Sequence, residues 1–275
     1  MILDEIISNK KDEITQRKRR ITLAEIRDRA GSAPAPRDFV SGLSREQVAL
    51  IAEIKRASPS RGALRGEFSL PQLAFEYAGN GAAAISVLTD QKYFAGDLGD
   101  LESSRIAVDV PILRKDFIIE EYQVYESRAF HADAILLIVR VLSDGQLRDY
   151  VALASSLGMG VLMEIHEEAE VERALAADAQ VIGINNRNLL DFTVDLAVTE
   201  QLAPRILAQA GVGSGKIIVA ESGVFTRADV ERAARAGARA VLVGEALMRA
   251  DDVATKVREL AGVGLHLQPN AQGAS

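Results

Sequence analysis

Residues 48–55 read VALIAEIK, a run of apolar side chains that ends in a carboxylate and an ammonium. Seven later segments repeat the apolar run, in the order 82–89 (AAAISVLT), 110–114 (VPILR), 132–139 (ADAILLIV), 160–166 (GVLMEIH), 180–185 (QVIGIN), 216–221 (KIIVAE) and 239–244 (RAVLVG). Each has the length of a strand and is rich in Ile, Val or Leu. Continuous apolar runs of this kind are typical of parallel strands that are covered by helices.

Amphipathic segments separate these runs and predict helices between the strands. The starts of consecutive runs lie about 27 residues apart, which is the length of a βα unit. Eight such units predict an α/β protein with a (β/α)8 TIM barrel. A doubly wound open sheet is the alternative, although the G-x-G-x-x-G motif that such sheets often carry is absent from the sequence. The predicted helices are 97–107, 121–130, 143–157, 167–177, 195–203 and 226–236.

The composition is that of a globular protein and excludes several other classes. Of the 275 residues, 48% are hydrophobic and 26% are charged, unlike a disordered chain. The 32 Lys and Arg against 39 Asp and Glu give a net charge of −7, so we expect no nucleic-acid partner. Cys is absent, which excludes disulfides and a cysteine nucleophile. No apolar run approaches the ~18 residues that span a bilayer and no secretory signal opens the chain, so we expect no membrane partner and a cytoplasmic location.

Three regions are expected along the chain. We expect an N-terminal helical extension and linker that pack on the barrel in residues 1–46. The barrel itself is expected in residues 47–262, and a flexible tail in residues 263–275. Within the extension, Thr22 followed by Glu25 predicts the capped start of a second helix. The first helix is basic, and we interpret its charges as a solvated face rather than a binding arm. These side chains are Lys10, Lys11, Arg17, Lys18, Arg19 and Arg20.

Polar side chains recur where the apolar runs end. In a barrel the chemistry lies at the carboxyl ends of the strands, and alternate residues of a strand point inward. We therefore expect three carboxylates and three cations to meet in the mouth, namely Glu53, Glu164 and Glu221 with Lys55, Lys115 and Arg187. A closely mixed set of charges can shift pKa values in both directions, as acid–base catalysis requires. An internal network of salt bridges is the alternative interpretation.

The last two strand ends carry a pattern that favours phosphate binding. Residues 221–224 read ESGV before the helix at Thr226, and residues 243–245 read VGE before a short helical stretch. Glycine lets backbone N–H groups approach an anion, and a helix N-terminus adds positive charge. The corresponding loops of barrels commonly bind phosphate, although two plain turns are the alternative. The side chain of Glu245 is expected to point away, so that only its backbone N–H binds.

Metal binding and serine-hydrolase chemistry are not indicated. The three histidines His131, His166 and His266 are scattered, and no third ligand stands at a suitable spacing from Glu164 and His166. No G-x-S-x-G motif occurs. We therefore expect no metal.

Eight motifs stand in order along the barrel and together resemble a known family. They are IAEIKRASPS (51–60), SVLTDQKYFAG (86–96), PILRKDF (111–117), ADAILLI (132–138), MEIH (163–166), IGINNRNL (182–189), AESGV (220–224) and LVGEALM (242–248). The set resembles the indole-3-glycerol-phosphate synthase family, the barrel lyases of tryptophan biosynthesis. The first and third motifs are specific, whereas the ESG and VGE loops occur in other phosphate-binding barrels.

The resemblance implies a reaction without a cofactor. The substrate is 1-(2-carboxyphenylamino)-1-deoxy-D-ribulose 5-phosphate, and ring closure, decarboxylation and dehydration give indole-3-glycerol phosphate, CO2 and water. Carried over by position, Lys115 is the general acid and Glu164 the general base. Glu53 and Asn185 hold substrate hydroxyls and the region of the ring nitrogen, and Lys55 bridges the anionic ends of the substrate.

The resemblance also implies the residues that bind the substrate. The carboxylate end is received by Ser58 and Pro59. The aromatic ring is walled by Phe94, Phe117, Leu136, Leu189 and Leu242. The ribulose and phosphate end is held by Arg187, Glu221 and Ser222, and the phosphate itself by Lys55, Ser222, Gly223, Gly244 and Glu245.

Other hypotheses about the function of the barrel stay open. An isomerase of the phosphoribosylanthranilate type, or of the histidine pathway, would share the phosphate end but needs a Cys or Asp pair. A Schiff-base aldolase would use Lys115 as its nucleophile, and a non-catalytic phosphate-binding barrel would bind without turnover. We expect a phosphorylated small molecule as the partner and a monomer, with contacts to other tryptophan-pathway enzymes at most.

Overall fold

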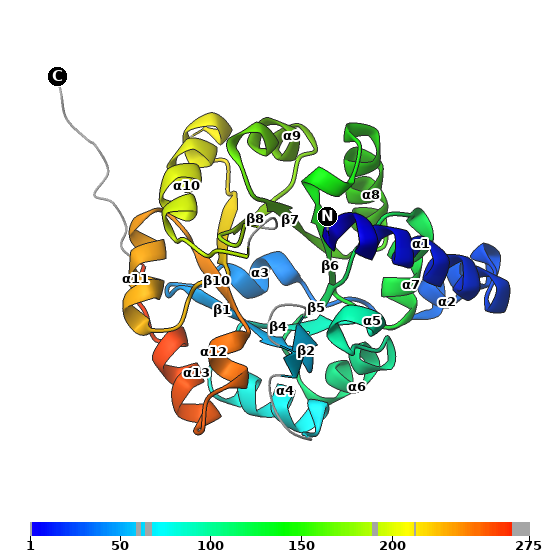
Figure 1. Cartoon of the computed structure of the whole chain (residues 1–275), viewed down its shortest axis with the longest axis horizontal. Coiled ribbons are helices and arrows are strands. Elements are labelled where there is room, and N and C mark those ends of the chain that lie inside the picture. The colour runs from blue at the N-terminus through cyan, green and yellow to red at the C-terminus, as the bar shows by residue number, and fades with distance from the viewer. Residues whose placement is uncertain (1, 59–61, 64–67, 189–191, 212, 266–275) are drawn as a thin grey trace.

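Eight parallel strands close into a barrel in the computed structural model, which describes residues 2–58, 62–63, 68–188, 192–211 and 213–265 (Figure 1). The strands are β1 (Ala49–Ile54), β4 (Ala84–Leu88), β5 (Ile112–Lys115), β6 (Ala134–Ile138), β7 (Gly160–Ile165), β8 (Val181–Asn185), β9 (Ile217–Glu221) and β10 (Ala240–Val243). Each pairs with the next along the chain, and β1 pairs with β10 to complete the ring. The predicted barrel is confirmed, and the open sheet was wrong.

Helices surround the ring, and each of the six predicted ranges contains one. These are α6 (Gly99–Ala107), α7 (Glu121–Ala129), α8 (Asp144–Ser156), α9 (Val171–Ala176), α10 (Ala197–Ala210) and α11 (Arg227–Arg235). Helix α10 continues beyond its predicted end and past Pro204, because Leu202, Ala203 and Ile206 bury one face of it. Outside the predicted ranges lie α4 (Leu70–Gly79), α5 (Gln91–Phe94), α12 (Glu245–Met248), α13 (Val253–Ala261) and the short 3-10 turn Val139–Val141, whereas the 3-10 turn Glu168–Glu170 precedes α9 within its predicted range.

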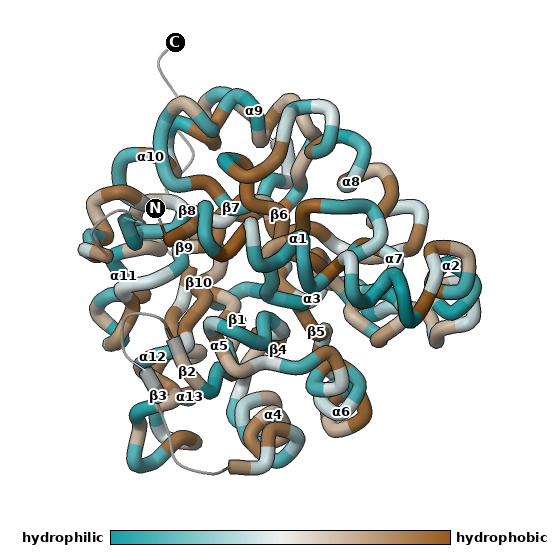
Figure 2. The backbone as a smooth tube through the Cα atoms, turned by 45° about the vertical axis from the view of Figure 1, so that its right-hand side comes forward, coloured by the Kyte–Doolittle hydropathy of each residue, from teal (hydrophilic) through white to brown (hydrophobic). Residues whose placement is uncertain are grey.

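Alternation along each strand separates two apolar layers. In β1, Leu50, Ala52 and Ile54 pack outward against the helices, whereas Ala49 and Ile51 belong to the barrel interior. The strands are accordingly the most hydrophobic part of the backbone (Figure 2). Helix α3 (Phe39–Leu43) contributes both of its buried ends to the interior cluster, at the end of the barrel opposite to the mouth.

The N-terminal helices lie on one side of the ring, where α1 (Ile2–Arg20) runs beside α2 (Leu23–Ser32) and α7 (Figure 1). Thr22 and Glu25 form the predicted capping box, each side chain bonding the other's backbone N–H. Ile14 and Ile26 pack with Tyr122 in a small cluster of their own. No helix in the described ranges is long and apolar enough to cross a membrane.

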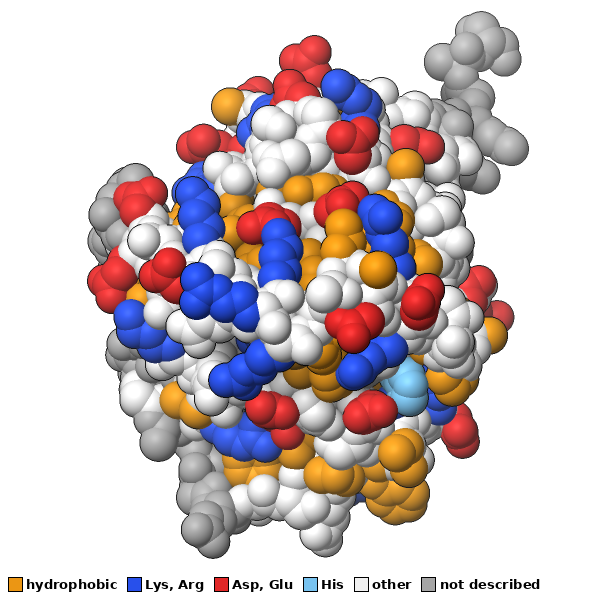
Figure 3. Space-filling model, turned by 90° about the vertical axis from the view of Figure 1, so that its right-hand side faces the viewer, with side chains coloured by type: hydrophobic (Ala, Val, Ile, Leu, Met, Phe, Trp, Pro, Cys, Tyr) orange, Lys and Arg blue, Asp and Glu red, His pale blue; other side chains and the backbone are white. Residues whose placement is uncertain are grey.

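The basic side chains of α1 are not a uniformly solvated face. Lys10 is completely buried, and Arg17 and Lys18 pair with Glu126 and Glu120 of the barrel. The prediction was therefore wrong for Lys10, because acidic side chains of the barrel cover that part of the helix. Basic and acidic side chains alternate over the face of the molecule that Figure 3 shows.

The predicted tail begins later than expected. Val263 is buried and its carbonyl accepts from Val48 N at 2.9 Å, and Gly264 forms a β-bridge with Gln47. These two residues close the barrel beside β1 and are not part of a flexible tail. Residues 266–275 lie outside the described residues.

A stability test follows from Asp133, which directly precedes β6 at the end of the barrel opposite to the mouth. Its carboxylate accepts from Arg37 N and Ile112 N, both at 2.8 Å, and from Arg105 Nε at 3.1 Å. Asp133→Ala leaves the buried N–H of Ile112 and the half-buried N–H of Arg37 without an acceptor, so the free energy of unfolding measured in urea should fall by about 3 kcal/mol. Because this end of a barrel governs stability, turnover at the mouth should stay within about twofold. The exposed change Asp12→Ala is the control, and an Asp133→Ala chain as stable as this control would contradict the assignment.

Candidate active site

A pocket opens at the carboxyl ends of the strands and collects most of the predicted site residues. Its lining includes the predicted Glu53, Lys55, Phe94, Lys115, Phe117, Leu136, Glu164, Asn185, Arg187, Glu221, Ser222, Leu242, Gly223, Gly244 and Glu245. Residues more than a hundred positions apart in sequence therefore share one cavity, as the barrel topology requires. Ser58 has its backbone in the short strand β2 (Ala57–Ser58), which pairs with β3 (Gly62–Ala63). Pro59, Leu189 and the side chain of Ser58 lie outside the described residues.

The ammonium of Lys115 lies between two glutamates. Nζ donates to Glu164 Oε2 at 2.9 Å and to Glu221 Oε2 at 2.8 Å. Burial works against the charge on Lys115, but Glu164, Glu221 and then Glu53 outweigh it and raise its pKa above the ordinary value. Lys115 is therefore a cation whose proton is held firmly in the free protein.

The two glutamates that share this ammonium have opposite pKa shifts. Burial raises the pKa of Glu221 to about 8; Lys115 opposes this, and the charge of Glu164 adds to it. For Glu164 burial is also unfavourable, but Lys115 and His166 outweigh it and lower its pKa. Two carboxylates beside one lysine cannot both ionise freely, so at neutral pH Glu164 is ionised and Glu221 carries a proton.

A second ion pair stands across the mouth at the end of β1. Lys55 Nζ lies 2.7 Å from Glu53 Oε1. Burial opposes ionisation of Glu53, but Lys55 and Lys115 together lower its pKa below the ordinary value. The salt-bridge network that the sequence left as an alternative is thus present, and it occupies the same pocket as the predicted catalytic groups.

Two glycines make room for these carboxylates. A Cβ built on Gly183 would overlap Glu221 Oε1, and a Cβ built on Gly244 would overlap Glu53 Oε1. Both glycines stand at positions that face the barrel interior: Gly183 lies on β8 and Gly244 directly follows β10. Any side chain at these positions would displace a carboxylate of the site.

The ends of β8 and β9 are tied together by polar contacts. Ser222 Oγ donates to Asn185 Oδ1 at 2.9 Å, and Ser222 adopts a φ of 64°. Asn186 is buried and its Nδ2 donates to the carbonyls of Glu221 and Ser222 at 3.0 and 3.1 Å. The sequence analysis did not single out Asn186, although it follows Asn185 and supports the same turn. Positive φ at a residue other than Gly marks a backbone that is held in place by such contacts.

The side chain of Glu245 was expected from the sequence to point away from the site, but Glu245 lines the pocket. Its carboxylate lies 4.0 Å from Arg187 Nη2 and accepts from Arg249 Nη1 at 3.2 Å. The two arginines explain why an acidic side chain stays beside a loop that was predicted to bind an anion. Arg187 Nη1 also donates to the carbonyl of Phe192 at 3.3 Å.

The apolar wall of the pocket comes from the barrel and from helix α1. The rings of Phe94 and Phe117 stand 6.3 Å apart at 37°. Ile2, Leu3 and Ile6 of α1 also line the pocket. Their helical spacing was visible in the sequence, but the surface that they cover was not.

The imidazole of His166 lies beside the carboxylate of Glu164. Its Nε2 lies 3.4 Å from Glu164 Oε1, and its Nδ1 lies 3.8 Å from Glu170 Oε2. Within the described ranges, no group of three His, Asp or Glu side chains is arranged to hold a metal ion.

The fold and the site define a (β/α)8-barrel enzyme with an acid–base centre in its mouth. The family model described as indole-3-glycerol phosphate synthase matches residues 3–260, so the chain belongs to the indole-3-glycerol phosphate synthase family. A relative of this name from Roseiflexus sp. (strain RS-1) is 48% identical over 268 residues, which cover 95% of this chain and 98% of the relative. Another from Dehalococcoides mccartyi (strain CBDB1) is 46% identical over 264 residues, which cover 94% of this chain and 100% of the relative.

Solved structures with low sequence identity share the architecture. Thiamine phosphate pyrophosphorylase from Pyrococcus furiosus superposes with a TM-score of 0.59 at 17% identity, covering 79% of this chain and 95% of that one. A 3-hexulose-6-phosphate synthase superposes with a TM-score of 0.57 at 19% identity, covering 78% and 98%. At these identities the likeness supports the barrel fold alone.

The glycine contact gives a test of the site's geometry. Gly183→Ala should lower kcat/KM at least about 100-fold, because a displacement of Glu221 by about 1 Å disturbs the groups around Lys115. The chain should remain folded by circular dichroism, since the displaced atom is the end of a side chain. Gly31→Ala is the matched control, because a Cβ there meets no atom within 4 Å. Full activity in Gly183→Ala would mean that the position of Glu221 is not critical.

Proposed function

We propose that this chain, as an indole-3-glycerol-phosphate synthase, closes the indole ring with Lys115 as general acid and Glu164 as general base. The observation that carries the assignment is the contact of the Lys115 ammonium with both Glu164 and Glu221 inside a pocket with an apolar wall. The substrate is 1-(2-carboxyphenylamino)-1-deoxy-D-ribulose 5-phosphate. The products are indole-3-glycerol phosphate, CO2 and water.

Ring closure needs a proton on the ketone oxygen of the substrate. The aromatic carbon attacks the carbonyl, and Lys115 donates its proton to the oxygen as negative charge develops there. Loss of CO2 then restores the aromatic ring. Lys115 is the best placed donor because it lies at the centre of the mouth and is protonated at neutral pH.

Dehydration needs a base and a second proton transfer. Glu164 is ionised because its pKa is lowered, so it can accept the proton that must leave as the double bond of the pyrrole ring forms. Lys115 takes up a proton from water after ring closure and donates it to the hydroxyl, which departs as water. Glu53 and Asn185 are positioned to hydrogen-bond the substrate hydroxyls and the ring nitrogen.

Binding of the substrate would draw on the two kinds of surface in the pocket. Phe94, Phe117, Leu136 and Leu242 offer an apolar wall to the aromatic ring. From the resemblance we propose that Lys55 bridges the two anionic ends of the substrate. On the same ground we retain Ser58 and Pro59 for the carboxylate and Leu189 for the wall. Holding both ends of the substrate bends it toward the geometry of ring closure.

The phosphate is proposed to bind at the loops after β9 and β10, where Ser222, Gly223, Gly244 and the backbone of Glu245 lie. Arg187 supplies the positive charge at this end of the pocket. The N-terminus of α11 contributes less than its position suggests, because Thr226 and Asp229 already cap it. Phosphate would therefore rely on the glycine turns and on Arg187.

Members of this family act on a small phosphorylated molecule. The oligomeric state, the location and the protein partners stay predictions: a monomer in the cytoplasm, with contacts to other enzymes of the tryptophan pathway at most.

The role of Lys115 can be tested directly by indole fluorescence, because the chain contains no Trp and its own background is low. Lys115→Ala should reduce the rate at least about 1,000-fold, the upper part of the range for general acid catalysis. Lys11→Ala, an exposed lysine of α1, should leave the rate unchanged. Undiminished turnover in Lys115→Ala would remove the proposed acid, and an imine trapped by borohydride would indicate aldolase-type chemistry instead.

The shifted pKa of Glu221 in the free protein predicts the pH dependence of kcat/KM. Below pH 8 Glu221 is neutral; above it the carboxylate ionises and adds a negative charge beside Lys115, which then releases its proton less readily. The value of kcat/KM in the wild type should therefore fall as the pH rises through about 8. Glu221→Gln mimics the neutral form at every pH, so this fall should disappear in the variant. An identical fall in both proteins would assign it to another group.

A further inference from the structure

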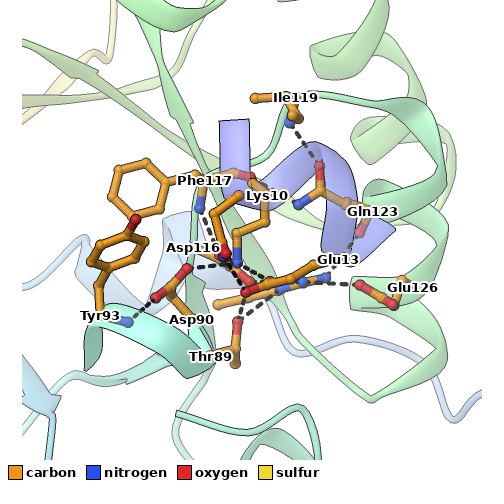
Figure 4. A network of polar contacts seen from close by, with 12 residues as sticks. Lys10, Glu13, Thr89, Asp90, Tyr93, Asp116, Phe117, Ile119, Gln123 and Glu126 are labelled. Carbon is orange, nitrogen blue, oxygen red and sulfur yellow. Dashed lines mark hydrogen bonds and ion pairs between the residues drawn. The ribbon is translucent and has the colours of Figure 1, made fainter. Parts of the chain in front are cut away.

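The N-terminal helix delivers one buried lysine to the rim of the barrel, outside the acid–base centre. Lys10 Nζ donates to Glu13 Oε2 at 2.8 Å and forms ion pairs with Asp90 Oδ2 at 2.8 Å and with Asp116 Oδ1 at 2.9 Å (Figure 4). The side chain has no exposed surface. Burying a charge is unfavourable unless it is well paired, so the position of Lys10 is a defined feature of the fold.

The charge state of this cluster is fixed. Burial lowers the pKa of Lys10, but Asp116 and Asp90 outweigh it and raise the pKa above the ordinary value. Burial also opposes ionisation of Asp116, but Lys10 and Arg114 outweigh it and lower its pKa. Lys10 and Asp116 are therefore oppositely charged over the whole range in which an enzyme of this kind would be assayed.

Asp116 connects Lys10 to the proposed general acid. It directly follows Lys115, its Oδ1 accepts from Phe117 N at 2.8 Å, and its Oδ2 accepts from Thr89 Oγ1 at 2.7 Å. The same carboxylate thus holds the turn that carries Lys115 and Phe117. A movement of Asp116 would shift both the acid and one side of the aromatic wall.

Asp90 connects Lys10 to the other side of that wall. It caps α5, and its Oδ1 accepts from Tyr93 N at 2.8 Å. Asp90 Oδ2 lies 2.8 Å from the ammonium of Lys10, so the charge of this carboxylate is balanced by Lys10. Helix α5 ends at Phe94, whose ring faces Phe117. One lysine therefore spans the two segments from which the aromatic pair projects.

The attachment of α1 to the barrel does not depend on Lys10 alone. Farther along the helix, Ile14 packs in the cluster with Ile26 and Tyr122, and Arg17 Nη1 donates to Glu126 Oε2 at 3.1 Å. Lys10 lies instead in the half of the helix nearer to the site, one or two turns beyond the pocket-lining Ile2, Leu3 and Ile6. Loss of Lys10 would loosen this half while the rest of the helix stays in place.

We propose that Lys10 is a positioning residue for the synthase reaction, and that its ion pairs with Asp90 and Asp116 set the places of the general acid and of the aromatic wall. The role rests on the proposed function. Lys10 does not touch the substrate in this proposal; it acts through the two aspartates. The first half of α1 is thereby coupled to the site by charge as well as by apolar contact.

The test compares two anchors of the same helix. Lys10→Met keeps the length of the side chain and removes the charge at the site end, whereas Arg17→Met removes a charge at the distant end. Lys10→Arg restores the charge with a different shape. For each chain, kcat and KM are measured by indole fluorescence, and the midpoint of thermal unfolding is measured by circular dichroism.

Lys10→Met should lower kcat about 10-fold and raise KM about fivefold, because both the acid and the ring wall lose their support. Arg17→Met should lower the unfolding midpoint but keep kcat and KM within about twofold. Lys10→Arg should recover most of the lost kcat. Equal losses of activity in Lys10→Met and Arg17→Met, at equal unfolding midpoints, would overturn the proposal and leave Lys10 a purely structural residue.

A milder variant decides the question if Lys10→Met does not fold. Asp90→Asn keeps an N-cap for α5 but breaks the ion pair, while Lys10 retains Glu13 and Asp116. It should raise KM about threefold with a smaller change in kcat, and unchanged KM and kcat would overturn the proposal. A wild-type chain that forms no indole would instead overturn the proposed function, and this role with it.

Discussion

Contact between the Lys115 ammonium and the carboxylates of Glu164 and Glu221 is the interaction on which the mouth of the barrel depends. Three ionisable groups in a buried place need one another, because a charge is not stable there without a partner. Their mutual arrangement leaves Glu164 ionised and Glu221 protonated at neutral pH. The same interaction that allows these groups to be buried therefore prepares them for proton transfer.

This arrangement is a direct result of strand alternation. Lys115, Glu164 and Glu221 stand at inward positions of β5, β7 and β9, and apolar residues fill the inward positions beneath them. Close packing leaves the side chains in the mouth of the barrel little room to move, so the site needs small residues as well as charged ones. Gly183 and Gly244 are the places where the barrel leaves space for the carboxylates.

Much of the barrel and of its mouth could be predicted from the sequence, because both follow from local patterns. Apolar runs at regular spacing predicted the strands, and polar residues two apart predicted which side chains face inward. The buried role of Lys10 could not be predicted, because a helix pattern shows which face is basic but not which carboxylates cover it. Asn186 and the placement of Glu245 depend on contacts with Ser222, Arg187 and Arg249, which are set by the tertiary fold.

Lys10 and Lys115 are connected through Asp116, which forms an ion pair with Lys10 and follows Lys115 directly in the chain. Lys115 points into the barrel, whereas Asp116, the next residue, meets Lys10 on the other side of the strand end. Consecutive residues of an extended strand face opposite sides, so a contact made outside the barrel is transmitted to the side chain inside it. A packed interior responds to such a shift as a unit and does not absorb it locally. The N-terminal helix, which supplies Lys10 and part of the pocket wall, is for this reason a component of the active site and not an appendage to the barrel.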